Sequence, residues 1–349
     1  MTGTDAPTTS ATAAARTYPD YGRPLWQRWL LTRESAVIAA LVVVAVVAAA
    51  VVPNFGTPIT LGFLLLDVTP ILLIALPMTL VIVSGEIDLS VASTLGLSSV
   101  LLGVLTKAGW PIEAAMVVCL VVGIVAGAVN GFLVTVVGLP SLAVTIGTLA
   151  LFRGIAVGLL GTTAITEFPF FWQNLAQQRF GTSGIPVVMV LVVVLIVVFA
   201  LLLHATPYGR GLFALGLSSE TAQFSGVHVA RTKFVAFMLT GLVAALAGIY
   251  WTLRYGSARG DNAVGLELSV IAAVLLGGVS IFGGKGAMHG VIAGVLLIGV
   301  LQSALRLANV SSDAINIITG VLLIVSVLSP RVLAWIRATR ATRRRNLTP

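Results

Sequence analysis

Residues 60–83 read TLGFLLLDVTPILLIALPMTLVIV, an apolar run that contains one charged residue, Asp67. As a helix, this run crosses the apolar layer of a bilayer, about 30 Å thick, with its backbone hydrogen bonds satisfied internally. Similar runs recur from Ser35 to Leu328. The chain is 58% hydrophobic and only 9% charged, whereas soluble domains carry about 25% charged residues. The sequence therefore predicts an all-α, polytopic membrane protein.

The apolar runs predict about ten transmembrane helices. They lie near 35–53, 60–83, 87–106, 111–137, 142–161, 185–204, 233–252, 266–282, 287–305 and 313–329. Pro70, Pro77 and Gly85 interrupt the second and third runs, so one of these two is a candidate for a broken or re-entrant helix.

A short motif is echoed between the two halves of the chain. Residues 88–91 read Asp-Leu-Ser-Val at the start of the third span, and residues 267–270 read Glu-Leu-Ser-Val at the start of the eighth. These positions are equivalent in two halves of five spans each, and an odd number of spans makes such halves inverted in the membrane. Two inverted five-helix halves are therefore our hypothesis for the fold.

Basic residues gather at both ends of the chain, which has a net charge of +8. By the positive-inside rule both termini are predicted to be cytoplasmic, and the charge indicates topology rather than binding to nucleic acid. We expect a disordered cytoplasmic tail at 1–34, a transmembrane permease domain at 35–330 and a basic cytoplasmic tail at 331–349. Arg254 and Arg259 fall on the predicted outer side and oppose the rule, although Asp261 and Glu267 lie nearby in sequence.

The segment 84–90 places Glu86, Asp88 and Ser90 between two apolar runs. A charge inside the membrane costs about 2.5–3.5 kcal/mol on insertion scales, so these carboxylates require water, a partner or a helix end. In a functional interpretation, Gly85 breaks the backbone and the next helix offers its free amides to a polar solute. In a structural interpretation, Asp88 is an N-cap and Glu86 is a solvated charge at the membrane interface.

Polar residues inside the predicted spans are few, and a sugar-sized solute can use several of them. The alternative for each is hydrogen bonding between helices or to the preceding turn. As residues of the substrate pathway we select Glu86, Asp88, Ser90, Asn130, Thr145, Thr148, Glu267 and Ser269.

The predicted cytoplasmic loop 205–232 contains a short amphipathic helix at 218–227. Ser218 or Ser219 caps this helix and Gly226 ends it. Because an isolated helix of two turns is marginal in water, it must rest on the membrane or dock into a partner, and we favour the partner. On the outer side, Phe168–Trp172 is an aromatic cluster that fits either an interfacial belt or a docking surface.

Enzymatic chemistry has no recognisable motif in this chain. The only cysteine, Cys119, lies in an apolar run, and the three histidines are far apart in sequence. The glycine-rich run ending in Lys285 and Gly286 lacks the Ser or Thr that a phosphate loop uses to hold magnesium. We therefore predict a transport protein that is not an enzyme, with no cofactor and no metal site.

Three motifs together resemble the permease subunit of bacterial ABC sugar importers of the ribose type, and the resemblance extends from about Leu41 to Leu328. They are MTLVIVSGEIDLSV at 78–91, PYGR at 207–210 with Ala222, Ser225, Gly226 and Val227, and IAAVLLGGVS at 271–280 with GGKG at 283–286. Residues 139–149 and 257–262 most resemble permeases of the rhamnose and autoinducer-2 types. Ala92 departs from the family, which commonly has Gly at this position.

The resemblance implies a dimer of permeases in the bacterial cytoplasmic membrane, a cytoplasmic pair of ATPases that hydrolyse ATP, and an extracytoplasmic binding protein that delivers the solute. It also implies that 218–227 is the coupling helix that enters a groove of the ATPase. The residues that it assigns to coupling are Gly209, Arg210, Glu220, Thr221, Ala222, Ser225 and Gly226.

A self-contained secondary transporter, driven by ions, is the alternative function. Such transporters also have inverted halves and polar residues at the membrane midplane, but ion coupling usually requires acids deep in the bundle. In this sequence the acids gather at the ends of the spans, and Asp67 is the exception.

Overall fold

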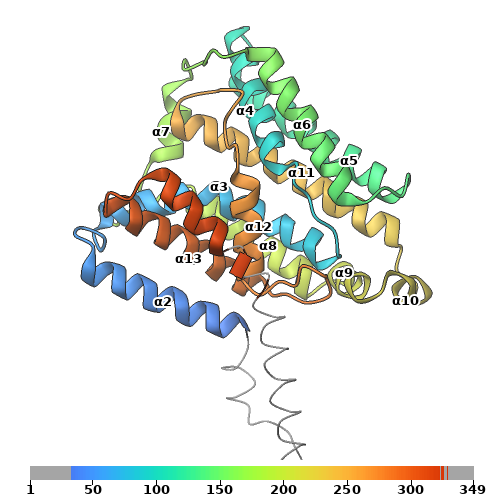
Figure 1. The fold of residues 1–349 in the computed structure, drawn as a ribbon. Coiled ribbons are helices and arrows are strands. Elements are labelled where there is room, and N and C mark those ends of the chain that lie inside the picture. The colour runs from blue at the N-terminus through green and yellow to red at the C-terminus, as the bar shows by residue number, and fades with distance from the viewer. Residues whose placement is uncertain (1–32, 323, 326–327, 329–349) are drawn as a thin grey trace, which may run out of the picture.

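The computed structural model describes residues 33–322, 324, 325 and 328, which form a bundle of helices (Figure 1). The helices are α2 (Arg33–Val51), α3 (Pro58–Val83), α4 (Val91–Lys107), α5 (Ile112–Thr135), α6 (Ser141–Leu160), α7 (Phe170–Gln177), α8 (Met189–His204), α9 (Pro207–Leu217), α10 (Ser219–Phe224), α11 (Val229–Tyr255), α12 (Leu266–Leu276) and α13 (Met288–Leu307). A further apolar helix, Ser312–Leu322, follows α13.

Each of the ten predicted spans coincides with a helix, which confirms the all-α, polytopic prediction. Six helices are long and apolar enough to cross a membrane, and α8 with α9, bent by 63° at their junction, makes a possible seventh. The other three are α4 and α12, which are shorter than predicted, and the helix that begins at Ser312, which is helical again at the described residues 324, 325 and 328. The inverted halves remain a prediction, and the tails at 1–32 and 331–349 lie outside the described residues.

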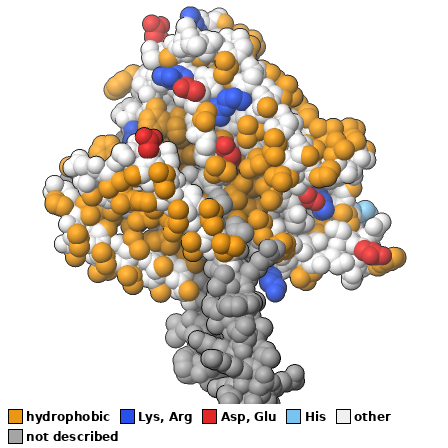
Figure 2. All heavy atoms as spheres, viewed as in Figure 1, with side chains coloured by type: hydrophobic (Ala, Val, Ile, Leu, Met, Phe, Trp, Pro, Cys, Tyr) orange, Lys and Arg blue, Asp and Glu red, His pale blue; other side chains and the backbone are white. Residues whose placement is uncertain are grey.

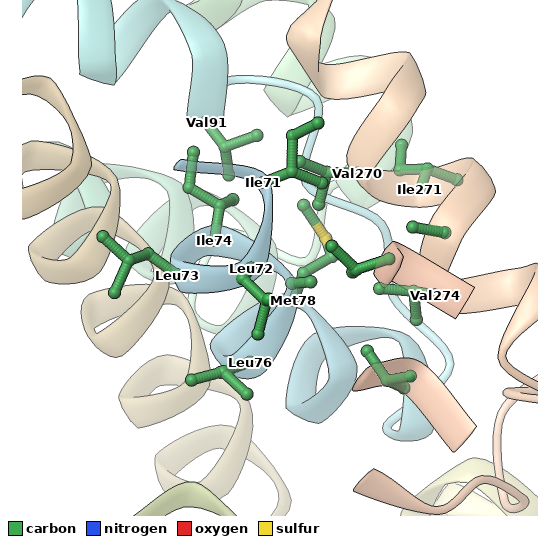
Figure 3. Close-up of a cluster of buried hydrophobic side chains, with 14 of the residues drawn as sticks. Ile71, Leu72, Leu73, Ile74, Leu76, Met78, Val91, Val270, Ile271 and Val274 are labelled. Carbon is green, nitrogen blue, oxygen red and sulfur yellow. The ribbon is translucent and has the colours of Figure 1, made fainter. Parts of the chain in front are cut away.

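Helix α3 is continuous over 26 residues, so the second predicted span is not interrupted by its prolines. Pro70 has no N–H to donate to the carbonyl of Leu66, and in a membrane a freed carbonyl needs another donor. The hydroxyl of Tyr250, on α11, supplies it and donates a hydrogen bond of 2.9 Å to Leu66 O. The helix crosses the centre of the bundle, and its side chains form the main apolar core with Val91 and residues of α12 (Figure 3).

The interruption falls instead between α3 and α4, where residues 84–90 are not helical. Helix α4 then begins at Val91 and is buried over most of its length. Its counterpart in the sequence echo, α12, spans only Leu266–Leu276 and ends at Gly277. The motif at 88–91 therefore leads into α4, and the motif at 267–270 lies in the first turn of α12.

Helices α5 and α11 form the closest helix pair and approach each other through glycines. A Cβ atom at Gly123 would lie 2.5 Å from the carbonyl oxygen of Gly241, and one at Gly127 would lie 2.9 Å from Cα of Met238. Small residues spaced by four positions allow two backbones in a membrane to come into contact. This contact places the start of α11 beside the end of α5.

Apolar side chains cover much of the visible surface (Figure 2). Val43 and Val46 on α2, Val117 on α5 and Val193 on α8 are each more than half exposed. A water-soluble monomer rarely exposes continuous apolar surface of this extent. The described surface is therefore suited to contact with lipid.

Candidate functional site

Residues 84–90 form the segment that links α3 to α4, and the start of α6 holds it in place. Gly85 turns the chain with a φ of 86°. The amide of Ile87 donates to Ser141 Oγ at 3.2 Å, and Thr145 Oγ1 donates to the carbonyl of Ile87 at 3.3 Å. These bonds satisfy both backbone groups of Ile87 away from any regular helix.

Asp88 lies at the centre of a buried polar network and is 1% exposed. Its Oδ1 accepts hydrogen bonds from the amide of Ser90 at 2.9 Å and from Ser90 Oγ at 2.6 Å. Asn130, on α5, donates from Nδ2 to Ser90 Oγ at 2.8 Å. The prediction that Asp88 is the N-cap is wrong, because Ser90 occupies that position and no side chain caps α4. Asp88 organises the turn one step before the helix.

Glu86 forms an ion pair with Lys233, at the start of α11, with 2.6 Å between Oε1 and Nζ. The two side chains are only 16% and 15% exposed. The interpretation of Glu86 as a solvated interfacial charge is therefore wrong. The pair ties the 84–90 segment to the helix that follows the predicted coupling loop.

The remaining predicted pathway residues occupy two places. Thr145 and Thr148 are buried on the inner face of α6. Glu267 and Ser269 are partly buried on α12, and among the described residues no hydrogen bond joins their side chains to the 84–90 network. The structure therefore gathers Glu86, Asp88, Ser90, Asn130 and Thr145 around one segment, and leaves the α12 pair apart.

Three grooves on the described part of the chain are lined by none of the eight predicted pathway residues. One, of about 270 Å³, includes Lys107 and Glu167; a second, of about 520 Å³, is apolar and includes Trp172 and Tyr250. The third, of about 700 Å³, lies beside α10 and includes Gln223 and Arg231. None of them brings the predicted pathway residues together around a solute-sized space.

One face of α6 is exposed and built from small residues. It comprises Ala143, Gly147, Ala150, Gly154 and Gly158. A Cβ atom added at Gly147, Gly154 or Gly158 would meet nothing within 4 Å. The opposite face carries Thr145 and packs on the 84–90 segment, so α6 separates the buried polar network from open space.

Arg254 and Arg259, the two basic residues on the predicted outer side, each form an ion pair with an acidic residue. Arg254 lies 3.7 Å from Asp67, which also pairs with Arg306 at 3.4 Å. Arg259 donates two hydrogen bonds of 2.9 Å to Asp261. These bonds lower the pKa of Asp261 and keep its carboxylate ionised. Each basic residue thus has an acidic partner on the same side of the bundle.

The predicted coupling loop contains two helices rather than one. Helix α9 starts at Pro207, and Thr206 caps it by accepting a hydrogen bond from Gly209 N at 3.2 Å. Helix α10 covers 219–224, shorter than the predicted 218–227. The cap of α10 is Ser218, one of the two serines predicted for this role, and its Oγ accepts a hydrogen bond from Thr221 N at 3.2 Å.

The side chains of α10 divide into a face toward the protein and a face toward the outside. Ala222, expected to enter a partner's groove, is 2% exposed within its own chain. Phe224 is 86% exposed and Leu217, at the end of α9, is 69% exposed. Glu220, Thr221, Ser225, Gly226 and Arg210 are exposed, and Gly209 is buried against the carbonyl of Leu203. The apolar residue that this loop presents is Phe224.

A family of proteins described as the permease component of branched-chain amino acid transport systems matches residues 60–327. The chain belongs to this permease family. Permeases named "Autoinducer 2 import system permease protein LsrD" are similar to it. The relative from Photorhabdus luminescens is 38% identical over 260 residues, which cover 73% of this chain and 78% of the relative. The relative from Salmonella paratyphi A is 35% identical over 313 residues, which cover 88% of this chain and 93% of the relative. No solved structure gives a significant match.

Membership of the permease family confirms the resemblance inferred from the three motifs. The structure brings the first and third motifs into contact, since the amide of Gly284 donates a hydrogen bond of 2.9 Å to the carbonyl of Val83. Ala92, where the family commonly has Gly, is fully buried and leaves its carbonyl free to accept a hydrogen bond from another helix. The extra methyl group is thus accommodated in the packing of this permease.

Sequence reasoning overlooked one residue of the permease, Arg153 on α6. Its guanidinium donates three hydrogen bonds, to the carbonyls of Gly260 at 2.8 Å, Asn262 at 2.7 Å and Ala92 at 3.1 Å. It also interacts electrostatically with Glu267. The signal was present, because an arginine inside an apolar span is costly and is rarely kept without a partner. Arg153 is the group that links the α12 side of the site to α4 and α6.

Replacing Asp88 by Ala in this permease should impair transport more than replacing Glu86 by Gln. The first change leaves the amide and hydroxyl of Ser90 buried without their acceptor, at a cost of about 1–3 kcal/mol for each group. The second removes the charge of a largely buried ion pair but keeps a side chain of the same shape, whose amide oxygen can still accept a hydrogen bond from Lys233 Nζ. Solute uptake and thermal unfolding of the purified variants measure the order. Uptake at the wild-type level in Asp88→Ala would show that the network is dispensable.

Proposed function

We propose that this permease imports a sugar or sugar-like solute as the membrane subunit of an ATP-driven ABC importer. Two permeases, a cytoplasmic pair of ATPases and an extracytoplasmic binding protein would form the complete system. The observation that carries the proposal is the capped helix α10 with its exposed Phe224, held between α9 and α11. A short capped helix with an exposed aromatic side chain is suited to a groove in a partner protein.

The solute class is inferred from the relatives, which are import permeases for autoinducer 2. The charged groups of the site also support an uncharged solute, because Glu86 and Arg153 are engaged within the chain and Asp88 is buried and hydrogen-bonded to Ser90. The name of the family points instead to branched-chain amino acids, whose carboxylate and ammonium groups require charged partners. Ribose, rhamnose or autoinducer-2 class solutes are therefore our first choice.

The test is to purify the permease with the ATPase and binding protein encoded beside it and to measure ATP hydrolysis with candidate solutes. We expect ribose, rhamnose or autoinducer 2 to stimulate hydrolysis and leucine to have no effect. Stimulation by leucine alone would replace the sugar assignment with the amino acid one. Uptake without any ATPase, abolished by a protonophore, would support the ion-driven transporter, for which Asp67 would have to leave its two arginines.

We place the transport pathway between two copies of the permease, along the exposed face of α6. In one chain the polar network is enclosed by hydrogen bonds, and the small residues of this face border open space. Small residues allow a second helix to approach closely or leave room for a solute. The 84–90 segment, immediately behind α6, is then within reach of the pathway.

Replacing Gly154 by Phe should abolish uptake, because the ring would occupy the space between the two permeases. The membrane level of the protein should stay normal, since no atom lies within 4 Å of the position of the new Cβ. Gly320→Phe is the matched control, as Gly320 also has open space around it. Uptake and cross-linked dimer are measured for both. Normal uptake in Gly154→Phe would remove this face from the pathway.

Both termini should be inaccessible from outside intact cells, as the distribution of arginine requires. On this orientation the permease lies in the cytoplasmic membrane, with 35–330 as the membrane domain and 205–232 as the coupling loop inside. Intact cells that carry tags after Thr2 and after Pro349 are treated with external protease. An epitope between α6 and α7 serves as the accessible control. Removal of the C-terminal tag by the protease would reverse the orientation.

A further inference from the structure

Three segments that are distant in the sequence meet through glycines at the end of the bundle that carries α9 and α10. The end of α3 contributes Val83 and Gly85, α9 contributes Gly216, and the loop between α12 and α13 contributes Gly283 and Gly284. The amide of Gly284 donates a hydrogen bond of 2.9 Å to the carbonyl of Val83. We call these five residues the glycine joint.

The backbones in the glycine joint touch without side chains between them. A Cβ atom at Gly216 would overlap the carbonyl oxygen of Val83 and the amide nitrogen of Gly284. A Cβ atom at Gly283 would lie 2.8 Å from Cα of Gly216 and 2.9 Å from the amide nitrogen of Gly85. Gly85, Gly283 and Gly284 have φ values of 86°, 80° and 70°, which favour glycine. Substitution of Gly216 or Gly283 by any larger residue must therefore move at least one of the segments.

Each of the three segments in the glycine joint is continuous with a different element of the fold. Gly216 is next to the last residue of α9, and α10 begins at Ser219. Gly85 begins the turn that carries Asp88 and Ser90 into α4. Gly283 and Gly284 belong to the loop that connects α12 with α13. The joint is thus the place where the coupling loop touches the candidate site.

The C-terminal end of the coupling loop also contacts residues 83–86, through an ion pair. Lys233, in the first turns of α11, forms its 2.6 Å ion pair with Glu86, the neighbour of Gly85. Helix α10 is therefore flanked on both sides by contacts to residues 83–86. A movement of α9, α10 and the start of α11 together, relative to α3, would therefore change one of these two contacts.

We propose that the glycine joint transmits the movement of α9 and α10, driven by the ATPase, to the 84–90 segment and α4. This inference rests on the proposed function. Close contact between backbones has little compliance, since no flexible side chain can absorb the displacement. Gly216 and Gly283 are positioning residues in this scheme, and neither contacts the solute.

The experiment follows the 84–90 segment directly in the complete transporter. A single cysteine is placed by Ile87→Cys in a Cys119→Ser background, because Cys119 is the only native cysteine. Its rate of labelling by a small maleimide is measured in nanodiscs with and without ATP and orthovanadate. We expect ATP to change this rate about fivefold, the lower end of the range of coupling between sites.

Gly216→Ala should reduce this response to ATP to less than about twofold while the ATPase stays bound, as expected when coupling between the two sites is lost. Gly211→Ala is the matched control on the same helix, because its Cβ would meet only the side chain of Val227, at 3.3 Å. It should respond as the parent does. A role in packing alone would lower the stability of Gly216→Ala but leave the response of position 87 to ATP intact.

Full response to ATP in an assembled Gly216→Ala complex would overturn the joint. If Gly216→Ala does not assemble, Gly284→Ala decides, since its Cβ would meet the side chain of Leu217 at 2.8 Å and the carbonyl carbon of Gly216 at 3.1 Å, and so presses on the same contact from the other segment. A reduced response in Gly284→Ala supports the joint, and an unchanged one overturns it. If no ATPase binds to the parent permease, the proposed function is wrong. If the parent complex assembles but labelling of position 87 does not respond to ATP, only the proposed role of the glycine joint is wrong.

Discussion

Replacement of Arg153 by Met is expected to abolish solute uptake and to lower the stability of the purified permease. The guanidinium binds three carbonyls, on α4 and on the loop before α12. Hydrogen bonds to a charged group are worth about 1.5–3 kcal/mol each, and methionine replaces none of them. The side chain also fills the space above Gly96, where a Cβ atom would lie 2.5 Å from Nη1 of Arg153. Uptake and thermal unfolding in detergent measure the effect.

Arg153→Lys should retain part of the activity, because lysine keeps the charge but lacks the planar fork that reaches three acceptors at once. Arg259→Met is the matched control. Arg259 is half exposed and pairs with Asp261 at the surface, so its loss should leave stability nearly unchanged. Similar stability and uptake in Arg153→Met and Arg259→Met would refute a linking role for Arg153.

Replacement of Phe224 by Asp should weaken binding of the ATPase by about 30-fold, the effect of losing a 2 kcal/mol hot spot. An aromatic side chain that is 86% exposed on α10 has little to lose within its own chain. The variant should therefore reach the membrane at the normal level and fail only in assembly. Titration of the detergent-solubilised permease with purified ATPase measures the affinity.

Phe170→Asp is the control for Phe224→Asp, because Phe170 is 81% exposed on α7, on the opposite side of the predicted membrane. It should leave binding of the ATPase unchanged. Ala222→Arg is a poor test of docking, since Ala222 is buried in its own chain and an arginine there would displace α10. Wild-type affinity in Phe224→Asp would show that α10 does not anchor the partner through this ring.

Much of the fold was predictable because the bilayer imposes a simple rule on the sequence. Every backbone group within the apolar layer must be bonded, so long apolar runs become helices whatever their order of packing. Ten runs and ten helices correspond for this reason. The cap at Ser218 was also predictable, because it depends on residues three positions apart.

The failures of prediction concern groups whose partners are distant in the sequence. Glu86 and Lys233 are separated by 147 positions, and Arg153 and Asn262 by 109. Nothing in the residues around Asp88 indicates that Asn130 completes its network. Likewise Pro70 should weaken α3, and only the hydroxyl of Tyr250 from α11 explains its continuity.

The sequence by itself determined that this protein spans a membrane, where its helices lie and which permease family it belongs to. The tertiary structure alone decided which face of each helix is buried, that Ala222 points inward and Phe224 outward, and that glycines of three segments touch. The physical reason is that hydropathy and capping are local properties of a few neighbouring residues. Pairing of charges and contact of backbones depend on how the helices cross, which no local pattern records.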